Sequence, residues 1–159
     1  MSSKKDENES IRVRTLIRAK PKQCYLNAFR VIQQVREYAR ADYVEGMAVV
    51  SGGLAIEHGW VEKDGVIVDP TLPSAELIYF PGLRFHGEPG LAKAIGIPKP
   101  EYTEDLPFFY RFGWGGIESP EFRAALIAAY RFVGCEALAQ QYERYTPKPL
   151  SKEPSLVTP

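Results

Sequence analysis

The clearest periodic pattern of the chain lies between residues 21 and 40. Apolar side chains recur there every three or four positions, which is the spacing of one helix face, and charged or amide side chains occupy the positions between them. The apolar positions include Cys24, Ala28, Val31 and Val35. Pro21 suits the first helical turn, because the N–H that proline lacks would have no partner there. The pattern therefore predicts a helix from Pro21 to about Arg40, with Cys24 in its first turn on the buried side.

Segments with strand character follow this helix. Residues 43–50 are rich in β-branched and aromatic side chains, and residues 54–62 alternate so that His58 lies on the apolar face. Asp64-Gly65 is a strong signal for a two-residue hairpin turn. We therefore expect residues 66–69 to return beside 54–62 as an antiparallel strand.

Three further elements are expected in the second half of the chain. Residues 75–80 have the character of a fourth strand, closed by the Pro-Gly pair that follows, and a short helix is expected near 89–95. Ser119 resembles a helix N-cap, and the proline after it suits the first helical position. This start predicts a final helix that runs to about Tyr145.

The two ends of the chain differ in composition from the part between them. Residues 1–10 are charged and polar, which predicts a disordered arm, and residues 146–159 form a proline-rich segment that is typical of an extended tail. Residues 11–145 are then a single domain of catalytic type, and the length of 159 residues fits one domain. Its expected class is α+β, with an N-terminal helix that carries the cysteine on a small antiparallel sheet, and a C-terminal helix.

Composition excludes several classes of function. Lys and Arg number 20, as do Asp and Glu, so the zero net charge gives no basis for a nucleic-acid partner. The chain has no apolar run of a membrane span and no apolar core of a secretory signal, which predicts a cytoplasmic protein without a membrane partner. Two cysteines and two histidines make a disulfide framework, a metal site and a cofactor site poor expectations.

Cys24, His58 and Asp69 are the candidates for a nucleophilic site. A thiol nucleophile needs a base within hydrogen-bond reach and a group that orients this base. Unpaired N–H groups and the helix dipole at a helix start favour a thiolate at Cys24. In the expected hairpin, His58 faces about position 71, so that Asp69 lies diagonally within reach of the imidazole. A core cysteine, a hydrogen-bonded core histidine and a turn-forming aspartate are the alternatives that the residues leave open.

The segments around these residues resemble the core of the transglutaminase-like, broadly papain-like, superfamily. The resemblance rests on Gln-Cys-Tyr-Leu-Asn-Ala at 23–28, Tyr-Val-Glu-Gly at 43–46, His-Gly-Trp-Val-Glu at 58–62 and Val-Asp-Pro-Thr at 68–71, in that order, and it covers about residues 20–72. It implies Cys24 as nucleophile, His58 as general base and acid, and Asp69 as the orienting carboxylate. It also implies an acyl-thioester made from an amide. The chain is far shorter than the larger members and has no acidic cluster for calcium.

Four further residues are candidates for positions beside the thiol. Gln23 could donate to an oxyanion, although neighbouring helix residues point about 100° apart. Asn27 either lines the site or bonds to the backbone, and Glu45 either meets substrate or a cation or faces solvent. Trp60 is expected to pack on the imidazole or in the core more readily than to bind substrate.

Three functions remain open at this point. The first is a thiol-dependent amide hydrolase or acyl transferase (a cysteine protease, deamidase or transglutaminase-like enzyme) acting on a protein or peptide amide. The second is a non-catalytic binding module on the same fold that uses the aromatic region 79–114. The third is a structural or oligomerisation protein built on the final helix. The oligomeric state is left open.

Overall fold

The computed structural model describes residues 4–101 and 103–147, which fold as five α-helices around one open sheet of five strands. The expected α+β class is thus confirmed at this coarse level. The elements are β1 (Lys4–Lys5), α1 (Glu7–Leu16), α2 (Cys24–Gln34), η1 (Arg36–Tyr38), β2 (Asp42–Val50), β3 (Leu54–Lys63), β4 (Val66–Val68), β5 (Leu77–His86), α3 (Gly87–Ile95), η2 (Phe108–Phe112), η3 (Trp114–Gly116), α4 (Pro120–Phe132) and α5 (Glu136–Glu143), where η marks a short 3₁₀ helix.

The strands lie in the order β1-β4-β3-β2-β5, and all neighbours are antiparallel except β1 and β4. β3 and β4 form the hairpin expected at Asp64-Gly65, with Val61 opposite Val68 and Lys63 opposite Val66. Both turn residues have positive φ, 52° and 78°, as a tight hairpin turn requires. Continued along β3, this register would place His58 opposite position 71, as the sequence predicts.

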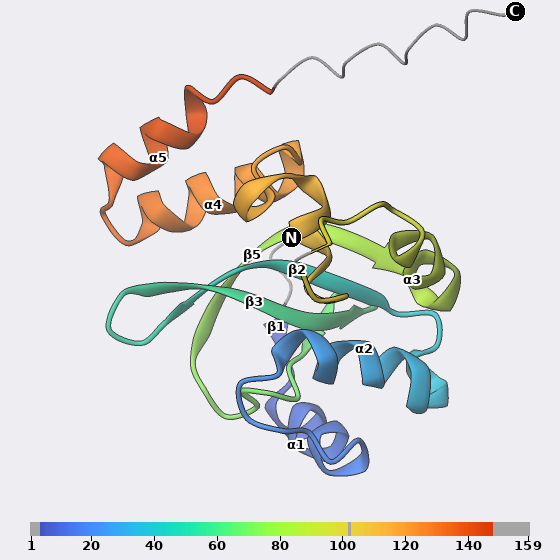
Figure 1. Cartoon of the computed structure of the whole chain (residues 1–159). Helices are drawn as coiled ribbons and strands as arrows, with labels where there is room; N and C mark the ends of the chain where they lie inside the picture. Colours follow the sequence, from blue (N-terminus) through green and yellow to red (C-terminus); the bar gives the residue numbers. More distant parts are fainter. Residues whose placement is uncertain (1–3, 102, 148–159) are drawn as a thin grey trace, which may run out of the picture.

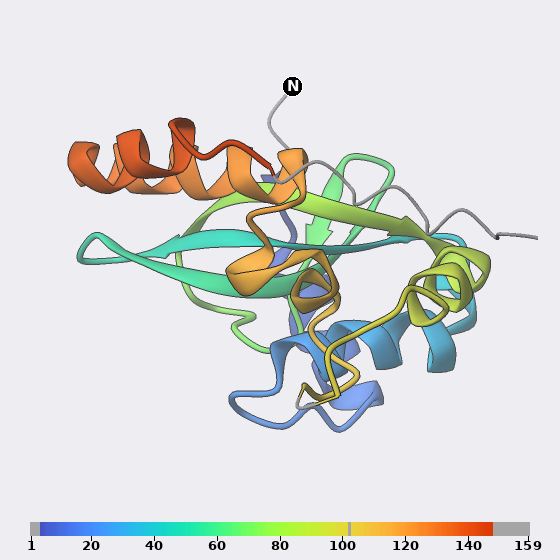
Figure 2. The same ribbon diagram turned by 45° about the horizontal axis from the view of Figure 1, so that its top comes forward.

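One side of β2 carries most of the core. Tyr43 belongs to a buried cluster with residues of α1 and α2, whereas Met47 belongs to a second cluster with residues of α4. Figures 1 and 2 show α1 and α2 along one part of the twisted sheet and α4 with α5 along another, with the segment that contains η2 passing between them. The opposite side of the sheet holds a smaller cluster of Val44, Trp60 and Ile67, against which Tyr79 packs.

The expected end of the fourth strand before Pro81 is wrong, because β5 continues to His86. β5 is an edge strand bonded to β2 alone, where a proline removes no hydrogen bond to a second neighbour. The pairing shifts by one residue beside Pro81, so that Gly46 faces Pro81 and Glu45 faces Leu83. The residue left over is Gly82, a β-bulge that keeps the apolar side chains of β5 on their faces.

The predicted disordered arm at 1–10 is also wrong for the residues that the structure describes. Lys5 lies in β1 and donates from Nζ to the carbonyl oxygens of Leu72 at 2.5 Å and Ala75 at 2.8 Å. Asp6 caps α1 by accepting from the N–H of Glu9 at 2.9 Å. The polar composition of this segment therefore reflects hydrogen bonding to the 72–75 loop and a helix cap, which composition alone does not reveal.

Two predicted helices are shorter than expected. α2 begins at Cys24 and ends at Gln34, because Val35 is extended with φ −108° and ψ 99°. The single final helix is divided into α4 and α5 at Gly134, whose φ of 78° ends α4 in the left-handed conformation that glycine favours. Most of the predicted tail, residues 148–159, lies outside the described residues.

Candidate functional site

Cys24 is the first residue of α2, and its side chain is half-buried. The first intrahelical bond runs from the N–H of Asn27 to the carbonyl of Gln23 at 2.8 Å. The N–H groups of the preceding turn have no acceptor within the helix, so they and the helix dipole favour negative charge at the thiol. Gln23 occupies the N-cap position, but its exposed side chain makes no capping bond.

The structure brings Cys24, His58 and Asp69 together. His58 is 1% exposed, and its Nε2 lies 2.7 Å from Oδ2 of Asp69. Cys24 contributes to raising the pKa of His58, which indicates that the thiol lies close to the imidazole. Since Nε2 is taken by Asp69, Nδ1 is the ring nitrogen that remains for the thiol. The imidazole and the carboxylate are thus hydrogen-bonded to each other, with the thiol close to the imidazole.

Asp69 is fully buried, and both of its carboxylate oxygens are hydrogen-bonded. Oδ1 accepts from the N–H groups of Thr71 and Leu72, at 3.0 Å each, in the turn that follows β4. Oδ2 accepts from the hydroxyl of Tyr79 at 2.9 Å, in addition to its bond with His58. The position of Asp69 directly before Pro70 thus forms a turn as well as holding the imidazole, and the two explanations are compatible.

The ionisation of His58 and Asp69 is linked. Burial lowers the pKa of His58, but hydrogen bonds and charges from Asp69 and Cys24 outweigh it and raise the pKa to about 9. Burial raises the pKa of Asp69, but hydrogen bonding from His58, the charge of the imidazole, and bonds from Leu72 and Tyr79 hold that pKa below its ordinary value. At neutral pH the pair is therefore an imidazolium beside a carboxylate.

Asn27 connects the helix to the turn that carries Asp69. It is fully buried one turn after Cys24, and its Oδ1 accepts from the N–H of Lys20 at 3.1 Å. Its Nδ2 donates to the carbonyl of Lys20 at 2.7 Å and to Oγ1 of Thr71 at 2.9 Å. Of the two expected roles, backbone bonding is the one observed, and the bond to Thr71 fixes the cysteine helix against the Asp-Pro-Thr turn.

Trp60 packs on the imidazole and in the core, as expected. Its ring stacks near that of His58, with centroids 6.2 Å apart and planes at 22°, and contacts the ring of Tyr79 at 5.0 Å. Its Nε1 donates to Oε1 of Glu62 at 3.0 Å. Tyr79 therefore contacts both His58 and Asp69, a role that was not predicted. The expected alternation of strand 75–80 could have placed Tyr79 on this face.

Glu45 does not face solvent, and that expectation is wrong. The residue is fully buried in β2, where its Oε1 accepts from the hydroxyl of Tyr43 at 2.6 Å and from the N–H of Phe108 at 2.7 Å. Its Oε2 accepts from the N–H of Phe109 at 2.8 Å. Burial raises the pKa of Glu45 to about 7. Glu45 thus attaches η2 to the sheet.

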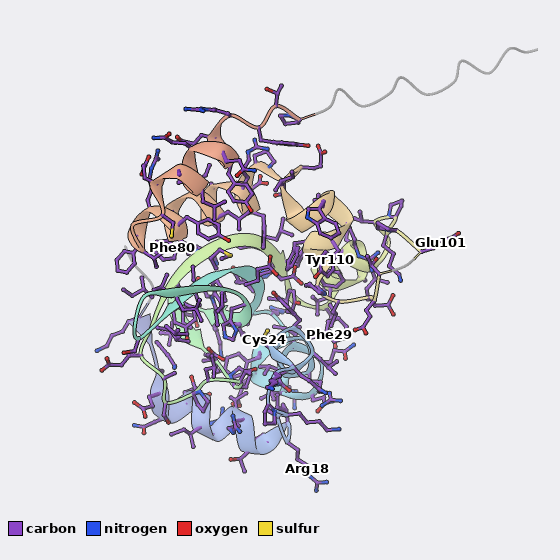
Figure 3. The ribbon with its side chains drawn as sticks, turned by 60° about the vertical axis from the view of Figure 1, so that its left-hand side comes forward. Arg18, Cys24, Phe29, Phe80, Glu101 and Tyr110 are labelled. Carbon is purple, nitrogen blue, oxygen red and sulfur yellow. The ribbon has the colours of Figure 1, made fainter. Side chains whose placement is uncertain are left out.

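A pocket of about 660 Å³ is lined by sequence neighbours of Cys24 and His58, although the described lining residues do not include Cys24, His58 or Asp69. Tyr25, which follows Cys24, and Glu57, which precedes His58, line it from α2 and β3. The segment held by Glu45 supplies much of the rest, including Tyr110 and Trp114. Figure 3 shows Cys24 at the start of α2 and Tyr110 on η2, on the same side of the molecule. The aromatic character of the region 79–114 is readable from the sequence, whereas the residues of it that line the pocket are not.

Across residues 4–101 and 103–147, no three His, Cys, Asp or Glu side chains gather in a way that could hold a metal ion. No helix in this described part of the chain has the length and apolar character needed to cross a membrane. Comparisons of the chain with protein-family models, with curated proteins and with solved structures give no match.

Proposed function

We propose that the chain is a thiol-dependent amide hydrolase or acyl transferase, with a papain-like or transglutaminase-like arrangement of Cys24, His58 and Asp69. The observation that carries the proposal is the buried hydrogen bond between the imidazole and the carboxylate, with a thiol close to the imidazole and at a helix start. A buried histidine held only for packing needs no thiol near it. A core cysteine needs no place at the positive end of a helix dipole.

The reaction would run in two steps. The sulfur of Cys24 attacks the carbonyl carbon of the amide, while the imidazolium of His58 gives its Nδ1 proton to the leaving nitrogen as the C–N bond breaks. A thioester remains on Cys24. Water or a second amine then attacks the thioester and gives a proton to His58, and the C–S bond breaks to restore the thiolate. Water yields the acid, and an amine yields a new amide.

The negative oxygen formed in each step needs hydrogen-bond donors. The backbone N–H of Cys24 has no acceptor within α2 and lies beside the attacking sulfur, so it is our candidate for one donor. The exposed side-chain amide of Gln23 is the candidate for a second. Asp69 holds the imidazole in place and stabilises its charge, a role that its two backbone hydrogen bonds in the turn support.

The proposal is tested first by alkylation with iodoacetamide, followed at each cysteine by mass spectrometry. Cys135 is exposed and Cys24 is half-buried, so accessibility alone predicts faster labelling of Cys135. A working thiolate predicts the reverse near neutral pH, and slower labelling of Cys24 in the His58→Ala variant. Labelling of Cys24 at or below the rate of Cys135 in the wild type would mean that the site is not assembled.

Turnover is tested next with amide substrate libraries. The Cys24→Ala variant should lose activity and keep its fold, measured by circular dichroism, while a Cys135→Ala variant should keep both. Full activity of Cys24→Ala would end the proposal.

A binding module on the same fold is the second candidate, because Trp114 is 85% exposed at the edge of the pocket. An aromatic side chain this exposed is a common feature of binding surfaces. In that case a partner would be lost on Trp114→Ala or Tyr110→Ala, and retained on Cys24→Ala.

A further inference from the structure

The pocket lined by Tyr25, the sequence neighbour of Cys24, has an aromatic wall. Tyr25 contributes a ring from α2, Tyr110 from η2 and Trp114 from η3. Leu106 and Pro107 add apolar surface. Rings of this kind attract both apolar groups and cations, because the face of an aromatic ring carries negative charge. The wall alone does not distinguish between these two kinds of occupant.

The charges of the pocket make this distinction. Among its described lining residues the charged side chains are two carboxylates, Glu57 and Glu104, and both are exposed. Within the described residues, neither carboxylate makes a hydrogen bond or an ion pair, although most other acidic side chains near the sheet are paired. Two unpaired carboxylates beside aromatic rings favour a positively charged occupant.

The two basic side chains of the segment 97–115, Lys99 and Arg111, are engaged elsewhere. Lys99 donates to the carbonyl of Thr103 at 2.6 Å and lies 3.6 Å from a carboxylate oxygen of Asp105. Arg111 donates to the carbonyls of Ile97 and Asp105, and its guanidinium lies over the ring of Phe108. The pocket is therefore not neutralised by the segment that builds it.

We infer that this pocket binds a basic side chain, lysine or arginine, of the amide substrate beside the bond that Cys24 attacks. The inference rests on the proposed function, since it places the pocket next to a working thiol. The alkyl stem of the side chain would lie against Leu106, Pro107 and the rings, and its charge would meet Glu57 and Glu104. The chain would then select amides flanked by a basic residue.

The test uses two matched peptides that carry a chloroacetyl group and differ in one residue, lysine or its uncharged counterpart norleucine. Their rates of labelling Cys24 are compared by mass spectrometry, with iodoacetamide as a probe that has no side chain. We expect the lysine peptide to label Cys24 about tenfold faster than the norleucine peptide. This is the effect expected of one contact between an ammonium group and a carboxylate that is assisted by an aromatic ring. In the Glu57→Gln and Glu104→Gln variants this ratio should fall towards one, with each rate divided by the iodoacetamide rate of the same variant.

A matched control is available on the same loop. Glu101 does not line the pocket and lies at the outer tip of the loop in Figure 3, so Glu101→Gln should keep the wild-type ratio. Equal labelling rates for the two peptides in the wild type, or faster labelling by the norleucine peptide, would overturn the inference. Fast labelling of Cys24 by iodoacetamide in the same protein would still leave the proposed function in place.

Failure of the thiol itself can be separated from failure of the pocket. If Cys24 proves unreactive, unmodified lysine and norleucine peptides are titrated against the Cys24→Ala protein, with Trp114 fluorescence as the readout. Trp114 is the exposed one of two tryptophans, whereas Trp60 is fully buried. Tighter binding of the lysine peptide supports the inference without catalysis, and no difference in binding overturns it.

Discussion

The proton held by His58 should be visible in the stability of the protein. Folding raises the pKa of this imidazole from 6.5 to about 9, so the folded chain binds the proton more tightly than the unfolded chain. The resulting stabilisation is complete below about pH 6.5 and is lost as the pH rises through about 9. At about 1.4 kcal/mol for each pH unit between the two values, it amounts to about 3 kcal/mol.

The measurement is the free energy of unfolding in urea, for the wild type and for His58→Gln, at pH values from 6 to 10. Other groups also titrate in this range, but those outside the site are shared by the two proteins, so the difference between the proteins reports His58 together with its partners Asp69 and Cys24. We expect the stability of the wild type relative to His58→Gln to fall by about 3 kcal/mol across this range.

A difference that does not change with pH would refute the reasoning, because it would mean that His58 is neutral in the folded protein at neutral pH. An increase with pH would mean that burial outweighs the attraction of Asp69. In either case the imidazolium that the proposed reaction uses to protonate the leaving group would be absent from the resting protein. NMR titration of the His58 ring gives an independent reading of the same pKa.

Two further substitutions test how the site is built. A methyl group at Gly59 would lie 2.8 Å from a ring carbon of Tyr25 and 3.2 Å from its Cα, so Gly59→Ala should cost about 1–3 kcal/mol in stability by urea unfolding. By displacing the first turn of α2 it should also slow alkylation of Cys24 about tenfold, and an unchanged rate would show that the turn tolerates movement. Burial raises the pKa of Glu45 from 4.5 to about 7, so the wild type should lose about 3 kcal/mol of stability between these pH values. Glu45→Gln should remove that loss of stability, and an equal loss in the variant would show that Glu45 is not its cause.

The candidate site could be predicted from the sequence because each of its three residues lies close in sequence to a strong local pattern, a hairpin turn or an apolar helix face. The Asp64-Gly65 turn sets the register of β3 and β4, and the register alone places Asp69 beside His58. The apolar stripe of the helix indicates the buried side of Cys24, although the expected helix starts three residues too early at Pro21. Local patterns determine these features, so they are readable without knowledge of the rest of the chain.

The parts that were missed depend on contacts between distant residues. Lys5 pairs with the 72–75 loop, and Glu45 accepts from backbone groups more than sixty positions later in the chain. No periodicity encodes such a contact, and a single acidic residue in an apolar strand is equally consistent with a solvent-facing position. The continuation of β5 past Pro81 was missed for a related reason, since a proline stops an internal strand but not an edge strand.

Asp69 and Glu45 are both fully buried, but their pKa values shift in opposite directions. Asp69 accepts hydrogen bonds on both oxygens and lies against the imidazolium of His58, whose positive charge compensates for burial, and its pKa is lowered. Glu45 also accepts hydrogen bonds on both oxygens, but its direct donors are a neutral hydroxyl and two N–H groups, so burial prevails and its pKa is raised. Hydrogen bonding alone therefore does not keep a buried carboxylate ionised here, and a partner cation does. Because Asp69 keeps its charge through His58, His58 in turn keeps its proton through Asp69, and Asp69→Asn should remove the high pKa of the imidazole together with the proposed activity.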